Sequence, residues 1–212
     1  MTRPELGLFI DPATHHFEQD RLFGDDQNPT VRDDVQAPYA EVRSWFQARG
    51  IPVHTGDLLE GGSEPCRRSV YISLGMRGRW RGLAERQDVE LAAFFALECP
   101  VVEPTLYRDL SGLEPSFRYL YSFSDGHSLR PFLERPLAFR TFRIPQSCNS
   151  VHDQLWSRGE RRLLTMINAN KLPRLYTREL YTERLRAIES FSSTGEFDLY
   201  GKGWDKPAHV SV

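Results

Sequence analysis

The chain has 212 residues, of which 40% are hydrophobic and 26% charged, a composition typical of a soluble globular protein. Its net charge of −2 gives no support to nucleic-acid binding, and no apolar run approaches the ~20 residues of a membrane-spanning helix. The start lacks the pattern of a signal peptide, and the three cysteines are odd in number and widely spaced. We therefore expect a cytoplasmic protein with no transmembrane segment and no nucleic-acid partner.

In the first part of the chain, short apolar runs alternate with polar turns and one helical segment. A helix is expected around 39–46, ending at Gly50. The run 91–97 (LAAFFAL) is typical of a strand buried on both faces of a parallel sheet. Strands are expected at 6–10, 51–54, 69–74, 91–97, 117–123 and 137–144. Residues 1–150 are thus expected to form a Rossmann-like domain.

Two polar segments of this part allow other interpretations. His15 and His16 are adjacent, but no third ligand stands at a recognised spacing, so we expect an exposed loop and predict no metal site. The glycine-spaced basic loop 75–82 (GMRGRWRG) leaves contact with an anionic ligand or peripheral contact with a membrane open. A solvated loop is the favoured interpretation.

After a polar connector at 147–159, a second α/β unit is expected. Residues 163–167 predict a strand, 168–173 a turn, and 197–200 another strand. Strand, loop, helix and strand form the opening of a nucleotide-binding unit.

The helix between these strands is expected at about 179–191, with Thr177 as its N-cap and Tyr181, Leu185 and Ile188 facing the sheet. A parallel domain needs more elements than these to cover both faces of its sheet. Residues 151–212 are therefore expected to form an incomplete unit. Apolar surface left near Met166, Phe197 and Leu199 should favour self-association or local disorder.

Glu98 is the candidate general base of the first part. The sequence has no G-x-G-x-x-G, P-loop or G-x-S-x-G motif, so dinucleotide binding, P-loop phosphate binding and the usual hydrolase nucleophile lose their main support. Glu98 directly follows the run 91–97, and ligands of open α/β sheets bind beyond the carboxyl ends of the strands. A glutamate there can take a proton from a substrate hydroxyl, the alternative being a helix cap or a loop salt bridge.

Basic residues gather around the start of the second unit's helix. Arg184 lies in its first turns, and Lys171 lies in the loop before it. A helix N-terminus with nearby cations is a natural diphosphate site, although solvated surface charge is an equal alternative. Asn168 and Asn170, just past a strand end, either bind a ligand or shape the turn.

Three blocks of the sequence resemble the family 10 glycosyltransferases, the α-1,3/1,4-fucosyltransferases, and especially their bacterial members. Together they span roughly 94 to 207. The blocks are 94–104 (FFALECPVVEP), 166–171 (MINANK) with 179–191 (ELYTERLRAIESF), and 197–204 (FDLYGKGW).

This resemblance implies a GT-B architecture, in which the N-terminal domain (1–150) binds a glycan acceptor and the C-terminal one, begun by 151–212, binds GDP-fucose. It implies transfer with inversion in one displacement and without a required cofactor, while the help of a divalent ion stays open. Glu98 matches the family's general base, and Arg184 matches the arginine that binds the donor diphosphate. Asn168, Asn170 and Lys171 match the loop that lines the donor side.

The family's later donor segment has no counterpart before Val212. The resemblance therefore implies that the donor domain is truncated here, and that these residues alone bind GDP weakly and transfer no fucose. Two alternatives stay open: a non-catalytic carbohydrate-binding or interaction module derived from such an enzyme, and a GT-B transferase that uses another sugar nucleotide.

Overall fold

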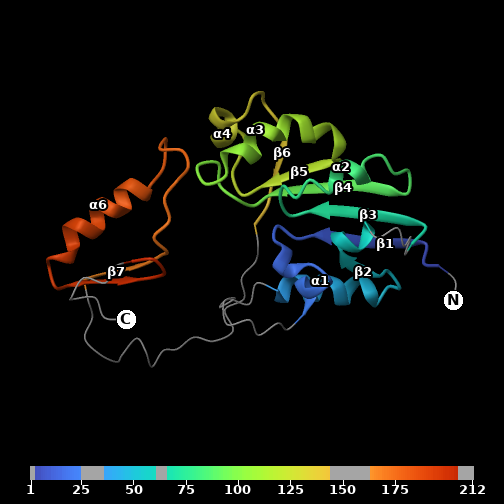
Figure 1. Ribbon diagram of the computed structural model, residues 1–212, viewed down its shortest axis with the longest axis horizontal. Helices are drawn as coiled ribbons and strands as arrows, with labels where there is room; N and C mark the ends of the chain where they lie inside the picture. The colour runs from blue at the N-terminus through green and yellow to red at the C-terminus, as the bar shows by residue number, and fades with distance from the viewer. Residues whose placement is uncertain (1–2, 25–35, 61–65, 144–162, 205–212) are drawn as a thin grey trace. The chain divides into compact units, whose positions relative to one another are not determined.

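The computed structural model describes residues 3–24, 36–60, 66–143 and 163–204. The chain forms two compact units, namely Met1–Pro100 with Thr105–Pro145, and Val101–Pro104 with Gln146–Val212. In Figure 1 the first unit runs from blue to yellow, and the second unit carries the orange and red elements. The polar connector expected at 147–159 lies outside the described residues.

A six-stranded parallel sheet forms the centre of the first unit (Figure 1). Because every neighbouring pair is parallel, all six carboxyl ends lie at one edge, here called the carboxyl edge. The expected α/β fold with a Rossmann-like parallel sheet is thereby confirmed for this unit. In spatial order the strands are β2 (Val53–Thr55), β1 (Leu6–Asp11), β3 (Arg68–Ser73), β4 (Val89–Ala96), β5 (Tyr119–Ser122) and β6 (Phe139–Thr141).

Helices and short 3-10 turns connect these strands. The α-helices of the unit are α1 (Ala37–Gln47), α2 (Trp80–Leu83), α3 (Pro104–Leu113) and α4 (Gly126–Leu129). The 3-10 turns are η1 (His15–Phe17), η2 (Arg21–Phe23), η3 (Gly56–Leu59), η4 (Glu114–Ser116) and η5 (Arg130–Phe132).

The helix α3 was not among the expected elements, although its signal is present in the sequence. Leu106, Leu110 and Leu113 recur at helical spacing and are all buried, and Pro104 is the first helical residue. The acidic and proline-containing segment before it resembles a loop, which obscures the start of the helix.

The two faces of the sheet are covered unequally. Side chains of α2, α3 and α4 pack with Phe9, Tyr71 and Phe94 in one large apolar core. On the opposite face, α1 and η2 contribute to a smaller cluster around Leu8 and Ile10. The expectation that the run 91–97 is buried on both faces was therefore wrong, because Phe95 points to the less covered face and is only partly buried.

The second unit contains β7 (Leu164–Ile167), α6 (Tyr181–Ser192) and β8 (Phe197–Tyr200), and its two strands are parallel. Apolar surface was predicted near Met166, Phe197 and Leu199, of which Phe197 and Leu199 are themselves buried. Side chains alternate across a strand, so the exposed positions are instead Leu163 and Ile167, which are 73% and 79% accessible.

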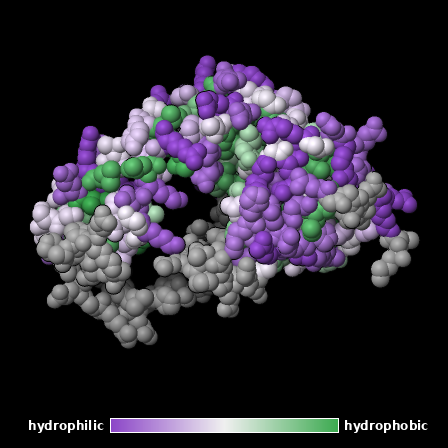
Figure 2. Space-filling view, viewed as in Figure 1, coloured by the Kyte–Doolittle hydropathy of each residue, from purple (hydrophilic) through white to green (hydrophobic). Residues whose placement is uncertain are grey.

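Apolar side chains also remain accessible around α6. Figure 2 shows hydrophobic surface over the second unit, where Leu180 and Leu185 are exposed. Of the three residues predicted to face the sheet, Tyr181, Leu185 and Ile188, Leu185 is exposed, so the prediction is wrong for Leu185. No helix in the described ranges combines the length and apolarity that a bilayer crossing requires.

Candidate functional site

The order in which the chain adds strands to the first unit's sheet reverses between β1 and β3, which makes this point of the carboxyl edge a topological switch point. From β1 the chain moves outward to β2, then returns past β1 to β3 and continues to β6. Ligands of open α/β sheets bind beyond the carboxyl ends at such a switch point. The residues that follow β1, β3 and β4 are therefore the candidate functional site of this unit.

Glu98 stands at this edge, as predicted. It follows β4 by two residues, and its side chain is exposed. The hydroxyl of Tyr107 on α3 donates a hydrogen bond of 2.5 Å to the backbone carbonyl of Glu98. The main chain that carries the carboxylate is thus anchored to the core, while the carboxylate itself faces solvent.

Tyr107 is suited to this anchoring role because it stays neutral. Its side chain is buried, and burial raises its pKa to about 12. A neutral phenol donates one hydrogen bond, and the carbonyl of Glu98 receives it. This contact was not predicted, because it joins a strand exit to a helix that was not among the expected elements.

A buried ion pair lies at the switch point itself. Asp11, the last residue of β1, is fully buried, and its carboxylate accepts hydrogen bonds of 2.5 Å from both Tyr71 and Arg79. Burial outweighs these two contacts and raises the pKa of Asp11. A Cβ on Gly56 would come within 2.7 Å of the Cβ of Asp11, so only glycine fits there. Asp11 therefore holds Arg79 and is itself out of reach of a ligand.

The network continues from Arg79 to the rim of the site. The guanidinium of Arg79 lies 3.0 Å from a carboxylate oxygen of Glu18, and Arg77 donates to the same oxygen at 2.6 Å. Arg77 also contacts the exposed ring of His15. Burial alone would raise the pKa of Glu18, but the hydrogen bonds from His15 and Arg79 and the charge of Arg77 lower it.

These contacts correct the interpretation of the basic loop 75–82 as solvated. The side chains of Arg77 and Arg79 are only 14% and 9% accessible, and both are paired with carboxylates. Their ion pairs thus join the loop after β3 to β1 and to the loop that follows it. The signal that sequence reasoning missed is Asp11, which directly follows a predicted strand just as Glu98 does.

A second polar cluster lies beside the end of β2. The carboxylate of Asp20 lies 2.8 Å from the Nδ1 of His54, accepts from the backbone N–H of Thr55 at 2.8 Å, and pairs with Arg43 at 3.2 Å. Burial alone would raise the pKa of Asp20, but the hydrogen bonds from His54 and Thr55 lower it. Asp20 and the preceding Gln19 both have positive φ, and these contacts offset the strain of that backbone.

In the second unit, the asparagines predicted on the donor side lie where β7 ends. Asn168 donates from its backbone to Tyr200, and Asn170 donates from its side chain to the carbonyl of Gly203 at 2.9 Å. These contacts join the exits of β7 and β8. Within the described residues, the side-chain oxygen of Asn168 is buried and has no hydrogen-bond partner. Lys171 is exposed.

The close approach of these two strand exits requires a glycine. Gly201 has a φ of +138°, and a Cβ there would lie 1.9 Å from the carbonyl oxygen of Asn168. Trp204 donates its indole N–H to the same oxygen at 2.7 Å. The block 197–204 therefore has a structural reason for its glycine and its tryptophan.

Arg184 lies in the first turns of α6, as predicted. It is partly buried, and its guanidinium carbon lies 4.7 Å from the ring centroid of Tyr181. Thr177 was expected to cap this helix, but the N-cap is Leu180, and the carboxylate of Glu179 accepts from the first N–H groups instead. A longer side chain reaches these unpaired donors, and its negative charge suits the helix start.

The structure thus brings Asn168, Asn170 and the exit of β8 together, while Arg184 contacts Leu180 and Tyr181 at the start of its own helix. Glu98 belongs to the first unit and the four donor-side residues to the second. Among the side chains that are described, no group of three or more His, Cys, Asp or Glu residues is placed to hold a metal ion. Comparison with protein-family models, curated proteins and solved structures found no match.

Proposed function

We propose that this protein is an inverting glycosyltransferase that moves fucose from GDP-fucose to a hydroxyl of a glycan acceptor. The observation that carries the proposal is the placement of Glu98, an exposed carboxylate at the carboxyl end of an inner strand of a parallel sheet. The resemblance of the three sequence blocks supplies the reaction class, and the GT-B arrangement belongs to the same proposal.

Glu98 acts as the general base in this proposal. A sugar hydroxyl is a poor nucleophile, and a carboxylate within hydrogen-bond reach removes its proton as the bond to the anomeric carbon forms. The fucose–phosphate bond breaks in the same step, and the electron pair leaves with GDP. The anchoring contact from Tyr107 supports this role, because a base must be held at a fixed position relative to its substrate.

The donor side of the proposal rests on the second unit. Arg184 supplies a guanidinium for the diphosphate, where negative charge develops on the leaving group. Asn170 and Lys171 are exposed in the loop after β7 and are the groups that contact the donor in this proposal, beside Asn168 in the same loop. Glu179 competes for the anion at the start of α6, because its carboxylate already accepts from the first N–H groups.

The proposal is tested by a transfer assay on the full gene product, with GDP-fucose and a panel of glycan acceptors. The expected result is a fucosylated product with inverted anomeric configuration, formed together with GDP. Transfer from a different sugar nucleotide, with none from GDP-fucose, would favour the GT-B transferase with another donor. Acceptor binding without any transfer would favour the carbohydrate-binding module and overturn the proposed activity.

A further inference from the structure

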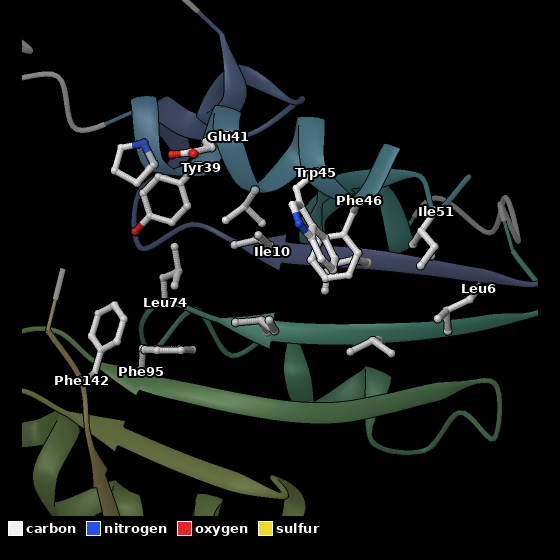
Figure 3. A pocket seen from close by; sticks show the side chains of 16 residues that line it. Leu6, Ile10, Tyr39, Glu41, Trp45, Phe46, Ile51, Leu74, Phe95 and Phe142 are labelled. Atoms are coloured by element: carbon white, nitrogen blue, oxygen red, sulfur yellow. The ribbon is translucent and has the colours of Figure 1, made fainter. Parts of the chain in front are cut away.

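A long apolar groove lies between α1 and the less covered face of the first unit's sheet. Its volume is about 650 Å³, within the range of small-molecule sites. Figure 3 shows Leu6 and Ile51 at one end, and Leu74, Phe95 and Phe142 at the other. Because β1 runs from Leu6 toward Asp11, the second end lies at the carboxyl edge.

The groove exists because α1 does not close onto the sheet. The helix carries an apolar side, yet none of its residues is buried, and Val42 and Trp45 are 37% and 52% accessible. Both line the groove, opposite Val70 and Ile72 of β3. Apolar surface of this kind, walled on two sides, favours an apolar ligand over water.

Two polar residues, Tyr39 and Glu41, line the groove, and Figure 3 shows them side by side. The hydroxyl of Tyr39 points from α1 toward the strands, near Leu74 (Figure 3). Burial raises the pKa of Tyr39, so the hydroxyl remains a neutral donor. No hydrogen bond joins it to any other described residue. A ligand with a polar group at this end of the groove could therefore form a hydrogen bond with the Tyr39 hydroxyl.

The same end of the groove leads toward Glu98. Phe95 lines the groove, and Glu98 follows it by three residues, which span at most roughly 10 Å of chain. A molecule with an apolar chain in the groove and a polar head at Tyr39 would thus present its head at the edge where Glu98 stands.

We propose that this groove binds the hydrocarbon chain of a lipid-linked glycan acceptor and leaves its sugar at the carboxyl edge. The assignment to an acceptor rests on the proposed function. The binding of an apolar chain does not, because it follows from the groove alone. The two parts are therefore tested separately.

Binding is measured on the 212-residue chain with alkyl β-glucosides of increasing chain length, below their micelle concentrations, by calorimetry and tryptophan fluorescence. The expected result is about fourfold tighter binding for each added methylene, with no binding of methyl glucoside. Trp45 lines the groove, so Trp45→Phe should remove the fluorescence change. Affinity that does not depend on chain length would overturn the proposal.

Two substitutions on the same helix locate the site. Val42→Asp places a charge in the groove and should weaken octyl glucoside binding at least tenfold, whereas the exposed Gln47 does not line the groove, and Gln47→Asp should leave binding unchanged. Tyr39→Phe should weaken binding by about two- to tenfold. Equal effects of Val42→Asp and Gln47→Asp, with the fold verified by circular dichroism, would contradict the location.

The acceptor assignment is tested with octyl and methyl glycosides of the sugar that the full gene product fucosylates. The octyl compound should show a lower KM, and Val42→Asp should remove that advantage. Equal kcat/KM for both compounds would overturn the assignment while the proposed transfer stands. Chain-length-dependent binding without any transfer would remove both the proposed function and the acceptor assignment.

Discussion

The hydroxyl of Tyr107 and the backbone carbonyl of Glu98 are joined by a 2.5 Å hydrogen bond across the end of β4. Tyr107 is a positioning residue in our proposal, because it touches the main chain of the base and not the substrate. Tyr107→Phe keeps the ring in the core but leaves the carbonyl without its donor.

We expect Tyr107→Phe to lower stability by about 0.5–1.5 kcal/mol and to speed amide exchange at Glu98 and Cys99. In the full gene product it should lower kcat more than it changes KM, because the base is displaced while acceptor binding is retained. Tyr121→Phe is the matched control, since Tyr121 is half-buried and its described contacts are made by its ring. A fall in stability without faster exchange at Glu98 and Cys99 would show a merely structural role.

The buried pair of Asp11 and Arg79 makes a second prediction. Arg79→Met leaves the carboxylate of Asp11 buried with only Tyr71 as its partner. Such a break typically costs 3–5 kcal/mol, and we expect a loss of that order in urea unfolding. The double variant Asp11→Asn with Arg79→Met removes the uncompensated charge and should recover part of the loss. A double variant that is less stable by the sum of both single losses would contradict the pairing.

The Asp20 cluster predicts a pH dependence. The hydrogen bonds from His54 and Thr55 hold the pKa of Asp20 below its unfolded value near 3.9. A carboxyl with a lowered folded pKa contributes stability above its unfolded pKa, and this contribution is lost as pH falls through the folded pKa. Unfolding of the wild type and of Asp20→Asn should therefore differ most at neutral pH and converge below about pH 4. A difference that stays constant down to pH 2 would contradict the charged role of Asp20.

The cap at Glu179 predicts an effect on anion binding. Its carboxylate accepts from the first N–H groups of α6, which a diphosphate would otherwise approach. Glu179→Gln should tighten GDP binding by the 212-residue chain about two- to fivefold, from a starting affinity in the high-micromolar to millimolar range. Glu183→Gln is the matched control, because Glu183 is exposed and pairs with Arg186. Calorimetry that finds equal GDP affinity for the wild type and Glu179→Gln would place the diphosphate elsewhere.

Local patterns in the sequence were sufficient to predict the strands and the place of Glu98. The run 91–97 is apolar over its whole length, and a carboxylate after it must lie at a strand exit. The cluster of Asp11, Glu18 and Arg79 was not predictable in this way. Its members come from three separate segments, and only the pairing of β1 with β3 brings those segments together.

The groove was missed for a related reason. The helical spacing around Tyr39 and Val42 predicted an apolar side on α1, and such a side is normally expected to pack against the sheet. Whether it packs or stands away depends on the position of the helix over β1 and β3, which no local pattern encodes. The unpredicted α3 likewise hid the contact between Tyr107 and Glu98.

Turnover of the Glu98→Gln variant of the full gene product tests the central proposal most directly. The substitution keeps the shape of the side chain and removes its ability to take a proton. We expect kcat to fall roughly 100-fold or more while the affinity for GDP-fucose is unchanged. The exposed Glu85, which precedes β4 at the opposite edge of the sheet, is the matched control, and Glu85→Gln should retain full turnover. Near-normal turnover in Glu98→Gln would contradict the assignment of Glu98 as the general base.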